Sequence, residues 1–284
     1  MPSLIDMRRR IRTVRNTQQI TKAMKMISAA RLRKAQDRAF NARPYSGLLK
    51  EVLESLASRS GGGIHPLLAR REWKHVTAVV VTGDRGLCGA FNTNITRATE
   101  RFLKDHASGQ VDLIMVGRKG RDYFRRRKAA IIREHVAIFA RLDYTHAKQI
   151  GEEVIAAYAE QKTDAVFLIY NEFKSVISQK LTVEELLPLA PFTQAPGAVT
   201  VDYIYEQPPA ELFARLLPRY VETQIFRALL ESAAAEHAAR MTSMDSATNN
   251  AGDMIEGLTL NMNRIRQATI TKELIEVVSG AAAL

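Results

Sequence analysis

The C-terminal part of the chain carries one apolar stripe that is far longer than a globular domain needs. From about Pro218 to Leu284, apolar or small residues recur every three or four positions, with a mean spacing of roughly 3.5 residues, as in a coiled-coil seam. A helix of this length would measure roughly 100 Å, so most of it must leave the domain and cover its stripe against a partner. The stripe consists of Tyr220, Thr223, Phe226, Leu230, Ala233, His237, Met241, Met244, Ala247, Ala251, Met254, Leu258, Met262 and Ile265.

The N-terminal segment predicts a second long helix, over residues 3–58. Its proposed stripe includes Leu4, Met7, Ile11, Val14, Ile20, Met24 and Ile27, and resumes at Leu48, Val52, Leu53 and Leu56. Pro44 lies inside the pattern and predicts a kink or a short break, whereas Pro218 suits the first turn of the C-terminal helix. Packing both helices together as an antiparallel, left-handed coiled coil is the simplest way to bury both stripes.

Between the helices, short β-branched runs alternate with helical patterns, which is typical of a largely parallel sheet with helices on its faces. Strands are expected at 76–82, 111–116, 130–138, 165–170 and 173–187, and helices at 90–107, from Gly117 to about Lys128, and at 145–161. The expected organisation is an N-terminal coiled-coil helix (1–58), a linker (59–73), an α/β, Rossmann-like domain (74–208) and a C-terminal coiled-coil helix (209–284).

The charge of the chain is concentrated at one end. Residues 1–50 contain 13 Lys or Arg and 2 Asp, which gives +11, while the other residues contain 28 basic and 28 acidic side chains and sum to zero. Such a basic helix favours phosphate, acidic lipid or an acidic protein surface. One hypothesis is therefore a DNA-binding coiled-coil protein, although the basic residues share their turns with an apolar stripe that must pack.

Candidate catalytic chemistry is weak. The turn Gly83–Gly89 lies between a strand and a helix, where a phosphate loop would lie, but it lacks the Lys-Ser/Thr and the dinucleotide spacing, so a structural turn is favoured over a small-molecule site. Cys88 is the single cysteine, which excludes an intrachain disulfide, and a small buried residue is its expected role. The six histidines show no metal spacing, and no cofactor, metal site or catalytic residue is predicted.

The C-terminal end is unusual for a helix terminus, which is normally polar. The last eight residues, Val277 to Leu284, carry no charged side chain and become smaller toward the end. An apolar and thin tip indicates an apolar socket on another chain.

Several stretches resemble the gamma subunits of F-type ATP synthases, the family of central rotor shafts. The resemblance spreads over the whole chain and is specific. It rests on Ile20–Met26, Gly83–Gly89, Ala238–Met241, Arg266–Ala268 and the C-terminal text Ile270-Thr271-x-Glu273-x-x-Glu276-x-x-x-Gly280-Ala281.

The resemblance implies a non-catalytic subunit, present in one copy, that transmits torque between the membrane c-ring and a hexamer of alpha and beta subunits during proton-driven ATP synthesis. The catalytic sites would lie on beta. The resemblance further implies that Met24, Lys25, Arg240, Arg266 and Gln267 contact beta subunits. An apical bearing would comprise Leu274, Val277, Val278, Ala281, Ala282, Ala283 and Leu284, and Tyr203, Tyr205 and Glu206 would lie on the side of epsilon and the c-ring.

The expected location follows from the same resemblance and from the start of the sequence. No signal peptide or transit peptide is apparent at the N-terminus, and no run is apolar enough to span a bilayer. We therefore expect a protein peripheral to a membrane, on the cytoplasmic side of a bacterial plasma membrane, that binds no nucleic acid.

Overall fold

The computed structural model describes residues 3–59, 65–107, 109–190 and 207–282. It divides into two compact units. The helical unit comprises Met1–Ala29 with Arg240–Leu284, and the α/β unit comprises Ala30–Ala239.

The α/β unit contains one five-stranded sheet in the order β3-β2-β1-β4-β5. The first four strands are parallel and β5 is antiparallel to β4, so the expectation of a largely parallel sheet is confirmed. The expected strand 173–187 is wrong at its start, because β4 continues to Phe173 and a turn precedes Gln179. The strands are β1 (His75–Val81), β2 (Gln110–Val116), β3 (Ile131–His135), β4 (Ala165–Phe173) and β5 (Gln179–Leu187).

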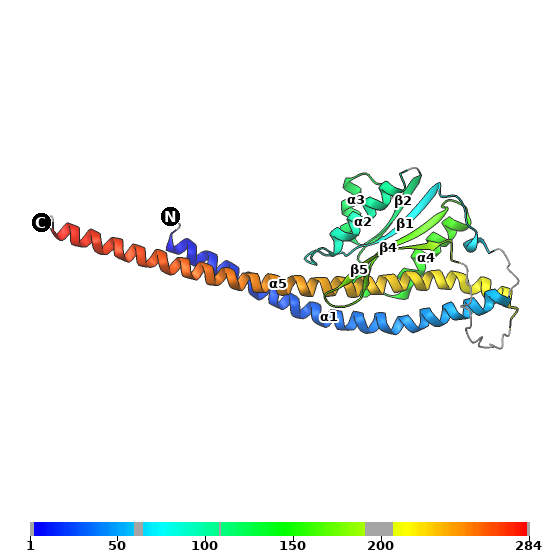
Figure 1. Ribbon diagram of the computed structural model, residues 1–284, viewed down its shortest axis with the longest axis horizontal. Helices are drawn as coiled ribbons and strands as arrows, with labels where there is room; N and C mark the ends of the chain where they lie inside the picture. The colour runs from blue at the N-terminus through cyan, green and yellow to red at the C-terminus, as the bar shows by residue number, and fades with distance from the viewer. Residues whose placement is uncertain (1–2, 60–64, 108, 191–206, 283–284) are drawn as a thin grey trace. The chain divides into compact units, whose positions relative to one another are not determined.

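Both faces of the sheet are covered by helices, as continuous burial along β1 requires. Helices α2 (Phe91–Asp105) and α3 (Arg118–Arg126) lie on one face, and α4 (Tyr144–Ala159) lies on the other (Figure 1). Short 3₁₀ turns occur at Pro66–Leu68 and Ile138–Arg141. The core on the α4 side also includes side chains from both long helices, such as Leu53 and Leu229, which ties these helices to the sheet.

The two long helices are α1 (Leu4–Arg59) and α5 (Pro209–Ala282). Of the kink or short break expected at Pro44, the break is wrong, because α1 continues through this residue, and the kink stays a prediction. Pro218 also lies inside a helix rather than in its first turn, since α5 begins at Pro209. Proline lacks only one backbone donor, and packing along both long helices outweighs that local loss.

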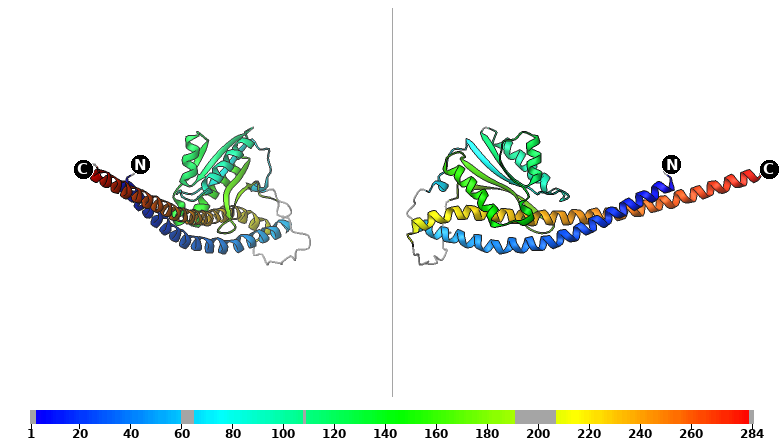
Figure 2. Two further views of the ribbon diagram at one scale, coloured as in Figure 1. Left: turned by 60° about the vertical axis from the view of Figure 1, so that its left-hand side comes forward. Right: turned by 180° about the vertical axis from the view of Figure 1, so that it is seen from behind.

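Within each unit the two helices run antiparallel, as Figure 2 shows. In the helical unit the hydroxyl oxygens of Thr21 and Thr248 lie 2.8 Å apart. In the α/β unit the amide of Gln224 donates to the hydroxyl of Ser46 at 3.2 Å. The pairs Thr21–Thr248 and Lys25–Asp245 give the same direction within the helical unit as Arg43–Glu231 and Ser46–Gln224 give within the α/β unit: the residue number rises on α1 as it falls on α5. This confirms the antiparallel arrangement of the expected fold class.

The buried residues of α1 follow a seven-residue repeat, which is the spacing of a left-handed coiled coil. This seam differs from the expected stripe by one residue, because Ile20 and Ile27 are 60% and 54% exposed while their neighbours Thr21 and Ser28 are buried. Leu48 is also exposed, and on α5 so is Met254. The buried positions are Met7, Ile11, Thr21, Ser28, Leu32, Ala39, Ser46, Leu49, Leu53 and Leu56.

Candidate functional site

The C-terminal end of α5 is exposed along its described residues and carries an apolar face. Every side chain that the structure describes from Arg266 to Ala281 is exposed, and Val277 is 70% exposed. Leu274, Ile275 and Val278 are also exposed. At about 100° per residue these apolar side chains cover roughly half of the helix surface, and Lys272, Glu273 and Glu276 lie on the other half. An apolar face of this width is typical of a helix that packs against a partner.

Part of the expected bearing can be placed and part cannot. Leu274, Val277, Val278 and Ala281 lie on this exposed end of α5. Ala282 is the last residue of α5, without a described side chain, whereas Ala283 and Leu284 lie outside the described residues. Tyr203, Tyr205 and Glu206, expected on the side of epsilon and the c-ring, also lie outside them.

Lys25 occupies a seam position of α1 and is bound to α5. Its ammonium nitrogen lies 2.6 Å from Oδ1 of Asp245, and the two side chains are 42% and 45% exposed. Met24, the preceding residue, is half-buried. The signal for Lys25 was present in the sequence, because counting heptads from Leu4 reaches residue 25, yet only the fold identifies Asp245 as its partner.

The seam beside this ion pair is polar. The amide of Gln18 donates to the backbone oxygen of Thr248 at 3.4 Å, and the Thr248 hydroxyl also bonds the backbone oxygen of Met244 at 2.7 Å. Thr21 bonds the backbone oxygen of Gln18 at 3.0 Å. Since the hydroxyls of Thr21 and Thr248 both have hydrogen-bond partners, their burial costs little. The large apolar residues Ile20, Met26 and Ile27 remain exposed on α1.

The other expected contact residues lie far apart along α5. Arg240 is buried, at 7% exposure, while Arg266 and Gln267 are exposed. Arg240 and Arg266 are separated by 26 residues, which corresponds to about 39 Å of helix. The expected contacts are therefore successive points along a rod, in contrast to the convergent side chains of an active site.

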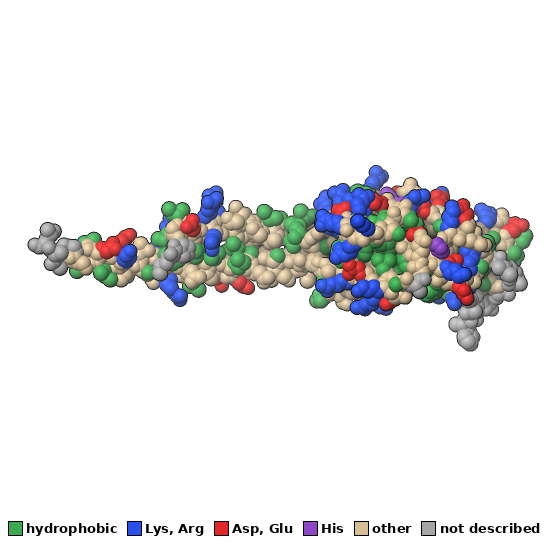
Figure 3. Space-filling model, turned by 90° about the horizontal axis from the view of Figure 1, so that it is seen from above, with side chains coloured by type: hydrophobic (Ala, Val, Ile, Leu, Met, Phe, Trp, Pro, Cys, Tyr) green, Lys and Arg blue, Asp and Glu red, His purple; other side chains and the backbone are tan. Residues whose placement is uncertain are grey.

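The exposed surface of the helical unit is both basic and apolar. Arg8, Arg9, Arg10, Arg12 and Arg15 of α1 are all exposed. Figure 3 shows apolar side chains along the visible face of this unit, with small groups of charged side chains between them. Such a surface suits contact with a partner that is partly apolar and partly acidic.

The glycine turn is a packing feature in the α/β unit. A Cβ added at Gly83 would meet the carboxylate of Glu236 at 2.9–3.1 Å, and Gly89 has a φ of 55°. Cys88 is buried, and the side-chain amide of Asn92 donates to its Sγ at 3.2 Å and also lies against the backbone of Arg85. The turn thus fits close against α5, which is the physical role that glycines perform there.

Two further properties concern the described part of the chain only. There, no three His, Cys, Asp or Glu side chains come together as ligands for a metal ion. Nor does any described helix combine the length and the apolar character that crossing a bilayer requires.

The family model described as ATP synthase matches residues 3–284. The chain is 56% identical to the ATP synthase gamma chain of Solibacter usitatus, over 100% of this chain and 99% of that protein. It is 51% identical to the ATP synthase gamma chain of Pelotomaculum thermopropionicum, over the full length of both.

Solved structures give the same result. A chain from the central stalk and c-ring of the mitochondrial ATP synthase of Tetrahymena thermophila matches with a TM-score of 0.65 and 29% identity, over 80% of this chain and 99% of that chain. A chain from the Euglena gracilis mitochondrial ATP synthase, in a structure of OSCP, F1 and c-ring in rotational state 3, has a TM-score of 0.69 over 99% of this chain and 94% of that chain. Its 18% identity supports the fold alone.

Proposed function

Because the chain belongs to the ATP synthase gamma chain family, we propose that it is the central-stalk rotor subunit that transmits torque between a membrane c-ring and the catalytic alpha/beta hexamer. Ion flow, which we take to be proton flow, would turn it, and the turning would drive successive changes at catalytic sites on beta. The subunit itself is non-catalytic. The observation that carries the proposal is the exposed apolar end of α5, which needs an enclosing partner.

The proposed bearing is Leu274, Val277, Val278 and Ala281–Leu284, turning inside an apolar sleeve of the hexamer. Apolar and small contacts suit a bearing because they lack direction, whereas hydrogen bonds would create preferred angles. The sequence similarity of these residues to the family supports the proposal.

We keep Met24, Lys25, Arg240, Arg266 and Gln267 as proposed contacts with beta. The exposure of Arg266 and Gln267 supports this role directly. Lys25 already has a carboxylate partner in Asp245, so an acidic group of beta would have to share or displace it.

The remaining partners are epsilon and the c-ring, with one gamma chain in each complex, and Tyr203, Tyr205 and Glu206 are proposed to face them. The organisation into a helix at 1–58, a linker at 59–73, an α/β domain at 74–208 and a helix at 209–284 is likewise our proposal. We place the protein at the periphery of a bacterial plasma membrane, on its cytoplasmic side.

Co-expression with alpha and beta subunits tests the function. We expect one copy of this chain to co-purify with the hexamer, and a bead attached to it to rotate when ATP is added. A stable monomer that does not bind the alpha and beta subunits would contradict the proposal. Binding of the chain to DNA that weakens steeply with salt would instead favour the DNA-binding hypothesis, which the similarity to gamma chains does not support.

A further inference from the structure

In the α/β unit, strand β4 extends beyond the end of its parallel neighbour β1. β1 pairs with β4 only from Ala165 to Ile169, whereas β4 continues to Phe173 alongside β5. The edge of β4 that faces away from β5 therefore has backbone polar groups without a strand beside them after Ile169. Such groups need other partners when they are buried.

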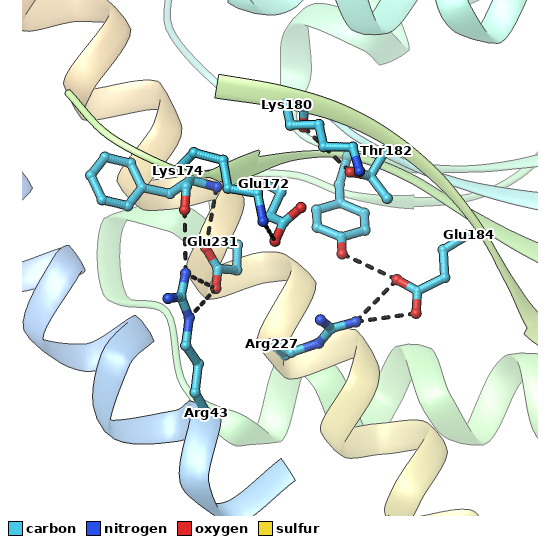
Figure 4. A network of polar contacts seen from close by, with 10 residues as sticks. Arg43, Glu172, Lys174, Lys180, Thr182, Glu184, Arg227 and Glu231 are labelled. Atoms are coloured by element: carbon cyan, nitrogen blue, oxygen red, sulfur yellow. Dashed lines mark hydrogen bonds and ion pairs between the residues drawn. The ribbon is translucent and has the colours of Figure 1, made fainter. Parts of the chain in front are cut away.

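Two side chains supply these partners at Phe173, one from each long helix. The backbone N–H of Phe173 donates to Oε2 of Glu231 on α5 at 3.2 Å. Its backbone oxygen accepts from Nη2 of Arg43 on α1 at 3.2 Å. Figure 4 shows Arg43 and Glu231 meeting at the end of the strand, where together they act as a substitute for a neighbouring strand.

Arg43 and Glu231 are also bound to each other. Nε and Nη2 of Arg43 each lie 2.9 Å from Oε1 of Glu231. The Glu231 side chain is 3% exposed and the Arg43 side chain 42%. A carboxylate with so little access to water depends on these donors, because a buried charge without partners is costly. One ion pair thereby joins α1, α5 and the sheet.

A second contact joins the same hairpin to α5 one helical turn earlier. Nη2 of Arg227 lies 3.2 and 3.0 Å from the two carboxylate oxygens of Glu184 on β5. The hydroxyl of Tyr170 donates to the same carboxylate at 3.1 Å. Burial raises the pKa of Tyr170, so its hydroxyl keeps the proton that it donates. Both strands of the hairpin are thus held by α5 (Figure 4).

We propose that Glu231, with Arg43, is a joint that fixes the angle of the α/β sheet relative to both helices of the shaft. The inference rests on the proposed function, because only a rotating shaft loads this joint. Apolar packing resists separation of the sheet from the helices but has no directional preference, whereas charge-assisted hydrogen bonds resist a sideways shift. Glu231 is a positioning residue, since it acts through Arg43 and the Phe173 backbone.

Angular stiffness in the assembled complex tests the joint. The alpha/beta hexamer is fixed to a surface, and a bead is attached through Lys162→Cys, a 73% exposed site of the α/β unit, while the native Cys88 is buried. The thermal spread of the bead's angle is recorded during a nucleotide-arrested pause. Glu231→Gln keeps the shape of the side chain but places an amide N–H₂ group beside the donors of Arg43 and the Phe173 backbone. We therefore expect a broader spread of the bead's angle and faster hydrogen exchange at the Phe173 amide.

Lys174→Gln is the matched control. It removes an ion pair within the same hairpin, to Glu172 at 2.6 Å, and leaves the Arg43–Glu231 pair in place. Its angular spread is expected to equal that of the unsubstituted complex. If Glu231→Gln fails to assemble, Arg43→Lys replaces it, because lysine keeps the charge and loses the planar fork.

The outcomes separate the two proposals. An angular spread in Glu231→Gln, or in its replacement, that equals the unsubstituted value overturns the joint, as does equal broadening in Lys174→Gln. A wild-type complex that hydrolyses ATP while its bead never rotates overturns the proposed function instead.

Discussion

Among single residues, Lys25 shows how a charged side chain can serve inside a coiled coil. It lies on the α1 seam and bonds Asp245 of α5 at 2.6 Å. Ion pairs between half-exposed side chains contribute only about 0–1 kcal/mol, so stability is a poor reason for its presence. A single lysine on a seam does define which residues of the partner helix it can face. Lys25 therefore helps to set the register between α1 and α5 in the helical unit and adds little to its stability.

Substitution of Asp245 separates the two roles of Lys25. We expect Asp245→Asn to lower the free energy of unfolding by less than about 1 kcal/mol, because the pair is half-exposed. It should also leave association with the alpha/beta hexamer intact or strengthen it, since Lys25 becomes available to beta, whereas Lys25→Met should weaken association. Denaturation and co-purification at several salt concentrations measure these effects. Equal weakening by both substitutions would argue against a contact of Lys25 with beta.

At the level of secondary-structure elements, α1 buries several polar residues and leaves several large apolar residues exposed. The α1 seam contains Thr21, Ser28 and Ser46, while Ile20, Ile27 and Leu48 face outward. Toward the C-terminal end of α1, the buried residues become apolar and include Leu49, Leu53 and Leu56, which join the core of the α/β unit. The same helix thus contributes to the core of the α/β unit near its C-terminal end and exposes Ile20 and Ile27 in the helical unit.

Two leucines of α1 test this register. Leu53 is fully buried and Leu48 is 56% exposed. We expect Leu53→Ala to lower the free energy of unfolding by about 2–5 kcal/mol, because it leaves a cavity in the core. Leu48→Ala, the matched control, should change it by less than about 0.5 kcal/mol. Chemical denaturation measures both, and similar losses for the two substitutions would show that the register is wrong.

The whole chain combines two units of different construction. The α/β unit has a sheet covered on both faces and a continuous core, whereas the helical unit is a helix pair with a polar seam and an exposed apolar end. Backbone hydrogen bonds in the helical unit are consequently less protected from water. In the proposed assembly, the alpha/beta hexamer would cover the apolar side chains that the helical unit leaves exposed.

Hydrogen exchange should reveal this difference. In the isolated chain we expect amides of residues 4–29 and 240–282 to exchange faster than those of β1, because local opening there costs less free energy. Assembly with alpha and beta should slow exchange in the two helical segments and leave β1 unchanged, which serves as the internal control. Mass spectrometry resolves these segments. Unaltered exchange in residues 266–282 after assembly would contradict the proposed bearing.

Much of the protein could be predicted from its sequence, because the signals are local. The β-branched runs with intervening helical patterns identify the parallel sheet, and the loss of charge after Glu276 identifies the apolar tip. The similarity to gamma subunits also rests on short, contiguous sequence motifs. These features depend on residues within a few positions of one another, so side-chain periodicity and composition were sufficient.

Only the tertiary structure decided the register and the partners. Apolar residues occur on both sides of the α1 seam, so periodicity alone could not choose between Ile20 and Thr21 as the buried residue. Arg43 and Glu231 are 188 residues apart, and their meeting at Phe173 depends on how two helices and a hairpin pack together. The physical reason is the same in both cases: burial and ion pairing are set by neighbours in space, which a local pattern leaves open.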